Sequence, residues 1–315
     1  MKNTVFITDY ISSPDIELDV LENYLSNKIS KEIQYILVWH EEIDKKFIDS
    51  LPNLKGIVRY GVGYENIDLN YCSKKNIMVC NNPDYGTDEV SDTALAMILN
   101  ISRGISRYDY FSRSYFDTWQ ENTIKSLKRT NESRVGIIGA GRIGGSLILK
   151  LNAIGFNTCF YDPYKERGYE KLLKSERYDN LNELLNKCDI ISLNCPQNEE
   201  TQGIVNEEFI KQMKKGSSLV NTARGGLISD IDYFLEPLRS NHISNLYLDV
   251  LPNEPPINSK LISEWRNRSE WLEGRLVINP HTAYFSKTSF QEMRSKAAKN
   301  VLRMIKGLKP FNKII

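Results

Sequence analysis

The stretch "RVGIIGAGRIGG", residues 134–145, decides the fold. An apolar run typical of a buried strand leads into Gly139, Gly141 and Gly144, which have the spacing G-x-G-x-x-G and precede a helical pattern. The first glycine permits a tight turn, the second lets the backbone approach a pyrophosphate, and the third lets the helix pack closely. Because a helix N-terminus stabilises phosphate charge, the stretch predicts a dinucleotide-binding βαβ unit.

An acidic residue at the end of the next strand supports this interpretation. Asp162 in "FYDPY" follows the next apolar run, where a carboxylate can bind the ribose hydroxyls of a dinucleotide. A carboxylate disfavours a 2′-phosphate, so Asp162 favours NAD over NADP. Lys165 and Arg167 follow closely and could weaken that preference.

Short apolar runs alternate with helical patterns along the whole chain. The expected strands cover residues 4–8, 35–39, 56–61, 77–80, 134–139, 158–162, 189–194, 218–222, 245–250 and 276–279. This rhythm predicts an α/β fold of two doubly wound parallel-sheet, Rossmann-like domains. The charged segment 164–179 is expected to be a solvated helix face, and an apolar stripe from Phe290 to Ile305 predicts a final helix that packs on the first domain.

Composition excludes several classes of partner. The 315 residues carry 41 Lys plus Arg against 40 Asp plus Glu, so the net charge does not favour binding to nucleic acid or to an anionic membrane.

The five cysteines form no C-x-x-C pair, which argues against a disulfide framework or a metal site and indicates a reducing, cytoplasmic compartment. The N-terminal residues do not resemble a signal sequence, and no apolar run approaches bilayer length.

Three polar side chains are expected at the carboxyl ends of strands in the second sheet. They are Arg224 in "VNTARGG", Glu254 in "LDVLPNEPP" and His281 in "INPHTAYFS". Reduction of a carbonyl needs an acid that protonates the oxygen and a cation that polarises the bond, and histidine and arginine suit these roles. A carboxylate bonded to the imidazole keeps its proton available near neutral pH. The structural alternatives are a salt-bridged Arg224, a solvated Glu254 and a satisfied structural His281.

Taken together, these residues resemble the D-isomer-specific 2-hydroxyacid dehydrogenase family, and most closely its bacterial branch similar to C-terminal binding proteins and phosphoglycerate dehydrogenases. The motifs that carry the resemblance are "RYGVGYENID", "NNPDYGTDEVSDTALAMIL", "NCPQNEETQGIVNEEFIKQMKKGSSLVNTARGG", "LDVLPNEP" and "NPHTAYFS". The resemblance implies an NAD(H)-dependent oxidoreductase that interconverts a small D-2-hydroxy acid and its 2-keto acid. It also implies a homodimer.

The resemblance further implies the domain roles. Residues 1–100 and 285–315 would form a flavodoxin-like substrate-binding domain, and residues 101–284 the NAD-binding Rossmann domain. The active site would lie in the cleft between the two domains.

Residue roles follow from the same resemblance. Arg224 would bind the substrate carboxylate and carbonyl, His281 would be the general acid and base, and Glu254 would be its partner. The substrate loop would comprise Arg59, Tyr60, Val62 and Gly63, with backbone N–H groups of the last two holding the carboxylate. The implied cofactor-binding residues are Gly139, Gly141, Arg142, Ile143, Gly144, Asp162, Cys195, Pro196, Thr201, Thr222, Ala223 and Asp249.

Some alternatives stay open at this point. A dinucleotide-sensing corepressor of the C-terminal binding protein type shares these residues, and the sequence does not specify which acid would be the substrate. Cys195 has no base at motif spacing, so it is interpreted as backbone lining near the adenine pocket. Trp265 and Trp271 could cover the substrate or pack a surface helix, and packing is favoured because amphipathic aromatics commonly cover helices.

Overall fold

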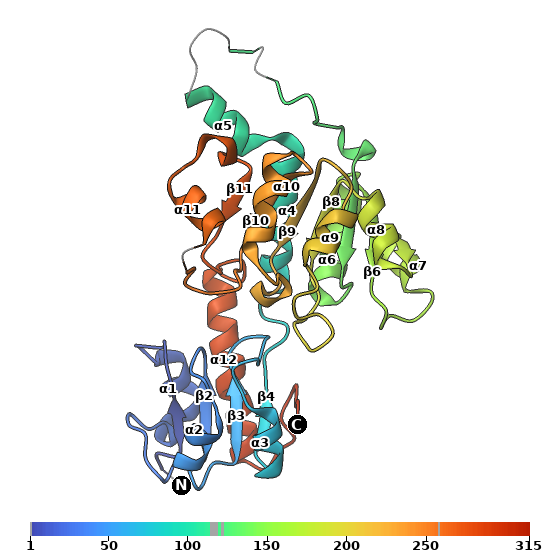
Figure 1. The fold of residues 1–315 in the computed structure, drawn as a ribbon. Helices are drawn as coiled ribbons and strands as arrows, with labels where there is room; N and C mark the ends of the chain where they lie inside the picture. The colour runs from blue at the N-terminus through green and yellow to red at the C-terminus, as the bar shows by residue number, and fades with distance from the viewer. Residues whose placement is uncertain (1, 114–118, 121–122, 258) are drawn as a thin grey trace. The chain divides into compact units, whose positions relative to one another are not determined.

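A computed structural model describes residues 2–113, 119–120, 123–257 and 259–315 (Figure 1). It divides into two compact units: unit 1 comprises Met1–Gly86 and Phe285–Ile315, and unit 2 comprises Thr87–Tyr284. The predicted boundary at residue 100 therefore falls inside helix α4 (Thr87–Arg103), which belongs to unit 2. The reason is packing, because Ala94 and Ile98 of this helix share a buried core with Val135 and Leu147 of unit 2.

Unit 1 contains a four-stranded parallel sheet in the order β1-β2-β3-β4. The strands are β1 (Val5–Ile7), β2 (Tyr35–Val38), β3 (Gly56–Arg59) and β4 (Met78–Cys80). Leu25 forms an isolated parallel bridge with Val5, on the side of β1 that faces away from β2. After β1 the chain therefore passes along one side of this strand at Leu25 and then along the other side as β2. This reversal of direction at β1 is the mark of a doubly wound sheet.

Helices cover both faces of the unit 1 sheet. They are α1 (Asp15–Leu21), α2 (Lys45–Ser50), α3 (Leu69–Lys74) and α12 (Lys287–Ile305). Ile48 of α2 and Cys72 of α3 share a buried cluster with Ile36 and Ile57 of the strands. The helix α12 packs against α1, β2 and β3, so the prediction that the last helix returns to the first domain is confirmed.

Unit 2 contains a seven-stranded parallel sheet in the order β11-β10-β9-β8-β5-β6-β7. The strands are β5 (Arg134–Ile138), β6 (Asn157–Tyr161), β7 (Glu176–Tyr178), β8 (Ile190–Leu193), β9 (Ser217–Asn221), β10 (Ile243–Leu248) and β11 (Leu276–Ile278). The order reverses between β5 and β8, which is the switch point where such sheets bind ligands.

The expectation of a solvated helix over 164–179 was wrong in part, because the end of this segment forms the edge strand β7.

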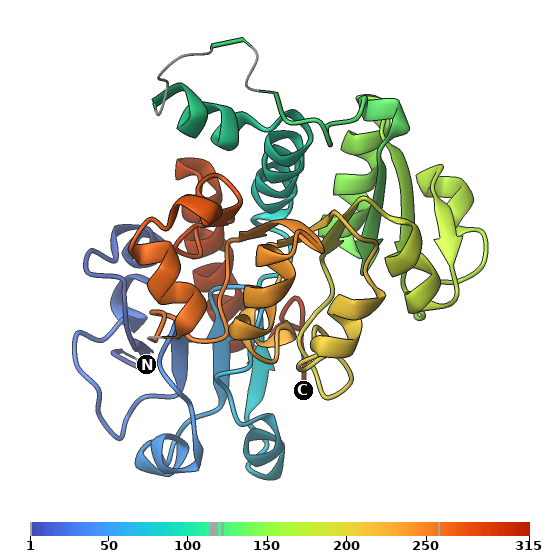
Figure 2. The same cartoon turned by 45° about the horizontal axis from the view of Figure 1, so that its top comes forward.

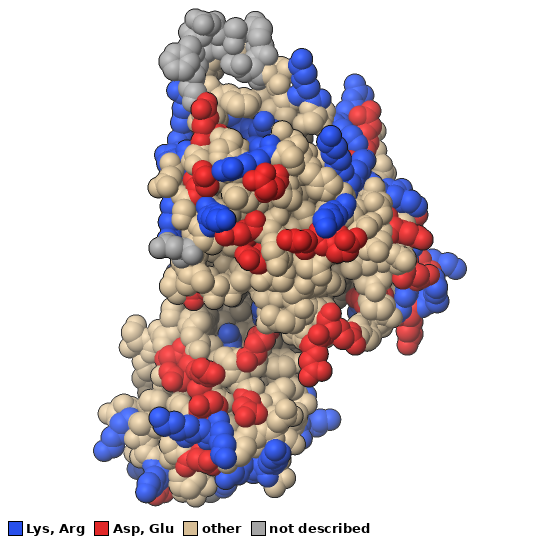
Figure 3. All heavy atoms as spheres, viewed as in Figure 1, with Lys and Arg blue, Asp and Glu red and all other residues tan. Residues whose placement is uncertain are grey.

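Two buried clusters lie on the two faces of the larger sheet, which helices flank in Figure 2. The helices of unit 2 besides α4 are α5 (Ile105–Arg113), α6 (Arg142–Ala153), α7 (Tyr169–Leu173), α8 (Leu181–Lys187), α9 (Glu207–Gln212), α10 (Leu235–Arg239) and α11 (Lys260–Arg266). No helix within the described ranges is long and apolar enough to cross a membrane. Acidic and basic side chains intermingle on the face seen in Figure 3, as the balanced composition predicts.

Candidate active site

The glycine turn lies at the switch point of the larger sheet. A Cβ on Gly139 would lie 2.6 Å from the backbone nitrogen of Cys195, so the turn after β5 packs directly on the turn after β8. A Cβ on Gly144 would collide with the carbonyl of Gly139, whereas a Cβ on Gly141 would meet nothing within 4 Å. The first and third glycines are thus required by packing, and the second faces open space that a ligand can enter.

The polar groups around this turn fit a dinucleotide. The helix α6 begins at Arg142 with Gly141 as its N-cap and has no side-chain cap, so its first-turn N–H groups are available to a phosphate. Two buried oxygens, Asn194 Oδ1 and Thr222 Oγ1, have no hydrogen-bond partner in the described part of the chain. Buried polar atoms are normally satisfied, and both of these directly follow strands beside the switch point, where a bound polar group would satisfy them.

Asp162 lies beside the glycine turn, at the end of β6. Its carboxylate accepts hydrogen bonds from the backbone N–H of Ala140 at 2.9 Å and of Tyr164 at 3.0 Å. The two cations that follow it are engaged elsewhere. Arg167 pairs with Asp179 at 2.7 Å, and the Lys165 ammonium lies 4.9 Å from the centroid of the Tyr169 ring.

Other predicted cofactor residues line the carboxyl edge through their backbone. Burial raises the pKa of Cys195 to about 11, so this thiol stays protonated and is no nucleophile at neutral pH. Thr201 Oγ1 donates to the Pro196 carbonyl at 2.7 Å and closes the turn after β8. Ala223 donates its N–H to Asn221 Oδ1 at 3.0 Å, which fixes the turn after β9.

Arg224 follows β9 in a loop that packs against the loop after β10. Its carbonyl accepts from Asn221 Nδ2 at 2.9 Å, and its Nη1 donates to the Ala223 carbonyl at 2.7 Å. The next residue, Gly225, lies so close to the Leu251 carbonyl that a Cβ would collide with it. The arginine loop therefore has a fixed position relative to the loop that carries Glu254.

Glu254 and His281 form a hydrogen-bonded pair. His281 Nδ1 lies 2.6 Å from Glu254 Oε2, and Glu254 Oε1 accepts from the Leu251 N–H at 2.8 Å. Burial alone would raise the pKa of Glu254, but the hydrogen bond and charge of His281, the Leu251 N–H and the charge of Arg224 hold it below its usual value. Three side chains predicted separately from the sequence thus act on one another.

Asp249 is buried, and its carboxylate binds only backbone N–H groups among the contacts described for it. It is 1% exposed and accepts from the backbone N–H of Thr282 and Ala283 at 3.0 Å, while its carbonyl accepts from the His281 N–H at 2.8 Å. His281 itself has a positive φ of 54°. Asp249 therefore holds the histidine loop in this conformation, and its predicted contact with a cofactor stays a prediction.

The predicted substrate loop of unit 1 gives a mixed result. The guanidinium of Arg59 lies over the Trp39 ring, 5.9 Å from its centroid, and Val62 is partly exposed. Tyr60, predicted to line the site, is 0% exposed and donates its hydroxyl to Glu17 at 2.9 Å. The ring of Tyr60 thus lies in the core of unit 1, and its predicted place beside the substrate stays a prediction that only its backbone could fulfil.

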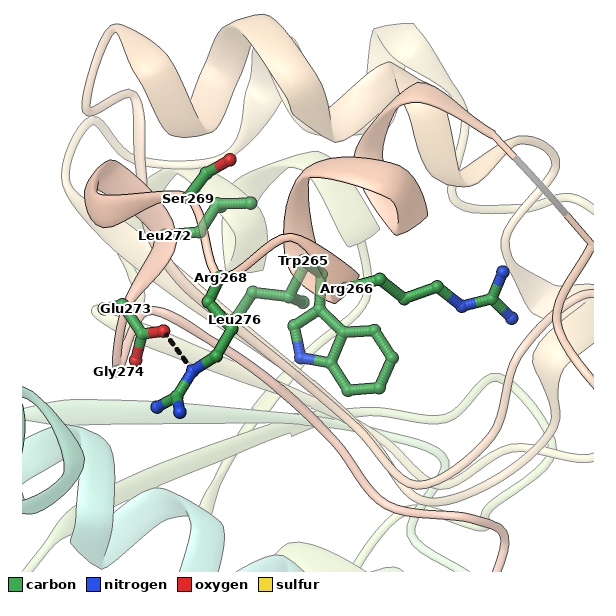
Figure 4. A pocket seen from close by; sticks show the side chains of 8 residues that line it. All are labelled: Trp265, Arg266, Arg268, Ser269, Leu272, Glu273, Gly274 and Leu276. Atoms are coloured by element: carbon green, nitrogen blue, oxygen red, sulfur yellow. Dashed lines mark hydrogen bonds and ion pairs between the residues drawn. The ribbon is translucent and has the colours of Figure 1, made fainter.

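The tryptophan-bearing segment packs on the surface of unit 2. Trp265 and Trp271 are partly buried against the larger cluster, and Trp271 Nε1 donates to Glu264 at 3.3 Å. A cavity of about 450 Å³ beside Trp265 is also lined by the ion pair of Arg268 with Glu273, shown in Figure 4. The preference for packing is confirmed, and none of Arg224, Glu254 and His281 lines this cavity.

Sequence reasoning missed Asn194, Asn221 and Gly225. Asn194 directly follows an apolar run and precedes Cys195, so its place at a strand end was available as a signal. The contact of Gly225 with Leu251 joins segments distant in sequence and had no local signal.

Residues 95–283 match the NAD-binding domain of the D-isomer specific 2-hydroxyacid dehydrogenases. The chain belongs to this family. It is 30% identical over 298 residues to C-terminal-binding protein 1 of Caenorhabditis elegans, an alignment that covers 91% of this chain and 39% of that protein. It is 29% identical over 272 residues to glyoxylate reductase of Thermofilum pendens, covering 86% of this chain and 77% of that protein.

Solved structures agree with this family assignment. D-lactate dehydrogenase from Aquifex aeolicus, complexed with NAD and lactic acid, has a TM-score of 0.83 at 27% identity and covers 97% of this chain and 96% of that chain. An NADPH-dependent glyoxylate/hydroxypyruvate reductase from Sinorhizobium meliloti has a TM-score of 0.84 at 22% identity, covering 100% of this chain and 97% of that chain. This second likeness is one of fold alone.

Proposed function

We propose that this protein is an NAD(H)-dependent oxidoreductase that interconverts a small D-2-hydroxy acid and its 2-keto acid. The observation that carries the proposal is the 2.6 Å pair of His281 and Glu254 with Arg224 near enough to lower the pKa of Glu254. Family membership and the likeness to an NAD complex of D-lactate dehydrogenase support it.

The three side chains have distinct tasks in reduction. Because His281 Nδ1 is bonded to Glu254, the other ring nitrogen is the one that donates a proton to the substrate oxygen. The negative charge of Glu254 stabilises the imidazolium, and the Leu251 N–H orients this carboxylate. The Arg224 guanidinium polarises the carbonyl and binds the substrate carboxylate. In oxidation, His281 accepts the proton instead.

The glycine turn, Asp162, Asn194 and Thr222 are the residues that would hold the dinucleotide. When bound, NADH supplies the hydride that reduces the carbonyl carbon. We favour NAD over NADP because the Asp162 carboxylate would repel a 2′-phosphate, and because Arg167 and Lys165 are engaged with Asp179 and Tyr169.

The experiment that tests this function is oxidation of paired D- and L-2-hydroxy acids by purified protein with NAD⁺. We expect NADH to form with one or more D-isomers and not with the matching L-isomers. Equal rates with both isomers, or none with either while NADH still binds, would contradict the proposal.

We also propose a homodimer, as the family resemblance implies. Light scattering at several concentrations tests it, and a constant monomer mass would contradict it.

A second candidate is a dinucleotide-sensing binding protein. The identity of 30% to C-terminal-binding protein 1 favours it, although this chain spans only 39% of that protein's length. Peptides with extended hydrophobic motifs, titrated with and without NADH, distinguish the candidates. NADH-dependent peptide binding without turnover of any acid would favour the sensor.

A further inference from the structure

The loop after β3 has its carbonyl groups bound from one side. Asn82 donates its side-chain Nδ2 to the Tyr60 carbonyl at 3.0 Å and its backbone N–H to the Gly61 carbonyl at 3.2 Å. Asn81 donates its Nδ2 to the Val62 carbonyl at 2.6 Å. Three consecutive carbonyls are thus fixed by two neighbouring asparagines that follow β4.

The N–H groups of the same loop have no such partners. Within the described ranges, the backbone N–H groups of Gly61, Val62 and Gly63 donate no hydrogen bond to the protein. Because peptide groups are planar, holding the carbonyls also fixes the directions of the N–H groups. Backbone N–H groups without a protein partner are available to bind an anion.

A buried polar network anchors this loop from below. Tyr60 donates its hydroxyl to Glu17 Oε1 at 2.9 Å, and Arg294 binds the two oxygens of Glu17 at 3.0 and 2.6 Å. Asn82 Nδ2 also donates to the carbonyl of Met293 at 3.2 Å. Tyr60 and Glu17 are 0% exposed and Asn82 is 2% exposed, so α1 and α12 hold the loop through contacts that exclude water.

Burying the charged and polar groups of this network costs free energy that apolar residues in the same place would not cost. Burial and the charge of Glu17 raise the pKa of Tyr60 well above its ordinary value, so its hydroxyl keeps the proton that it donates. Apolar residues of similar volume commonly stabilise a core as well as a buried ion pair does, whereas polar networks fix one arrangement of the backbone.

We propose that Tyr60, Asn82 and the Glu17–Arg294 pair are positioning residues that orient the N–H groups of Gly61, Val62 and Gly63 toward the carboxylate of the substrate. The inference rests on the proposed function for the identity of the anion. The residues named here touch no reacting atom and act through the loop. Tyr60 acts through its buried hydroxyl and not by contact with the substrate.

The test compares Tyr60→Phe with Tyr71→Phe. Both changes remove a hydroxyl that donates to a carboxylate in unit 1, but Tyr71 bonds to Asp49 on the exposed surface. The probe is oxamate, a carboxylate analogue of a 2-keto acid, titrated into the NADH complex while the amide resonances of Gly61 and Gly63 are followed by NMR. Turnover of 2-keto acids is measured in parallel.

For Tyr60→Phe we expect the Kd of oxamate and the KM of the 2-keto acid to rise about tenfold with kcat and NADH affinity nearly unchanged. Asn82→Leu, which removes both side-chain donations, should have a larger effect. Its matched control is Asn53→Leu, which removes one exposed bond to the Lys31 carbonyl.

The outcomes separate this inference from the proposed function. The inference is supported if oxamate shifts the loop resonances and if Tyr60→Phe, but not Tyr71→Phe, weakens oxamate binding. This holds even if no acid is turned over. If acids are turned over but Tyr60→Phe behaves as Tyr71→Phe does, or if oxamate leaves the loop resonances unmoved, the inference is overturned.

Discussion

The Cα of Gly225 approaches the carbonyl of Leu251 so closely that no side chain fits between them. Leu251 in turn donates its N–H to Glu254, which is bonded to His281. The position of the Arg224 loop relative to Glu254 and His281 is thus set by a contact between two backbone segments, which leaves no room for a side chain on residue 225.

Gly225→Ala should therefore separate binding from chemistry. The added Cβ pushes the Arg224 loop away from Glu254, and misplacement of about 1 Å can lower turnover about a hundredfold. NADH affinity measured by fluorescence titration should change less than kcat/KM, because the glycine turn and Asp162 lie outside the displaced loop. Unchanged kcat/KM would show that this contact does not set the catalytic geometry.

Replacement of His281 or Arg224 by Gln should lower kcat/KM by about a hundredfold to ten-thousandfold, the range expected for a general acid or an electrostatic clamp. The matched control is His242→Gln. The hydrogen bond described for the His242 side chain joins its Nε2 to the Ile210 carbonyl, away from Arg224, Glu254 and His281. Steady-state kinetics check this. Near-normal turnover by the His281 variant would remove this residue from the mechanism.

Glu254→Gln should change the pH dependence of reduction. The substitution removes the negative charge that faces the His281 ring at 2.6 Å, so the pH profile of kcat/KM should differ from that of the wild-type protein. The pKa of Glu254 is lowered in the folded protein, so its pairing stabilises the fold above its unfolded-state pKa and this stabilisation is lost as pH falls through the folded value. A profile of kcat/KM that does not move would exclude Glu254 from proton transfer.

Asp162→Ser should weaken the discrimination against NADPH. The carboxylate beside the glycine turn would no longer repel a 2′-phosphate, and we expect the ratio of kcat/KM for NADH to that for NADPH to fall about tenfold or more. Parallel assays with the two reduced cofactors measure the ratio. A wild-type protein that already prefers NADPH would refute the assignment of Asp162.

Arg275→Met should destabilise unit 2 strongly. Arg275 is 7% exposed and donates to the carbonyls of Ser244, Trp271, Leu238 and Ile243. Leaving these acceptors unsatisfied should lower the free energy of unfolding by about 3 kcal/mol or more, as measured in urea. Arg268→Met, which breaks an exposed pair with Glu273, should have a much smaller effect, and equal effects would contradict this account.

Local patterns were sufficient to predict most of the sheet and the pairing of Glu254 with His281. The apolar runs at 134–139 and 276–279 became β5 and β11, and the proline after β11 places His281 at the strand end. A continuous apolar run indicates a strand of a parallel sheet, because helices cover both faces of such a sheet. The short edge strand β7, with the sequence ERY, carries no such signal.

Tertiary contacts decided what local patterns could not. Tyr60 follows a strand, as a residue lining a site would, but its partner Glu17 lies 43 residues earlier in the chain. The apolar face of α4 predicted a helix without showing which core would bury it. Likewise, nothing near Asp249 in sequence indicates that its carboxylate binds the backbone of Thr282 and Ala283.

The most direct test of the central claim is consumption of NADH by the wild-type protein and by His281→Gln across a panel of 2-keto acids. The panel includes glyoxylate, pyruvate, hydroxypyruvate, oxaloacetate and branched and aromatic keto acids. We predict that the wild-type protein reduces at least one acid to its D-2-hydroxy product, and that the variant binds NADH but loses this activity. Binding of NADH without reduction of any acid, or equal rates for the two proteins, would contradict the account.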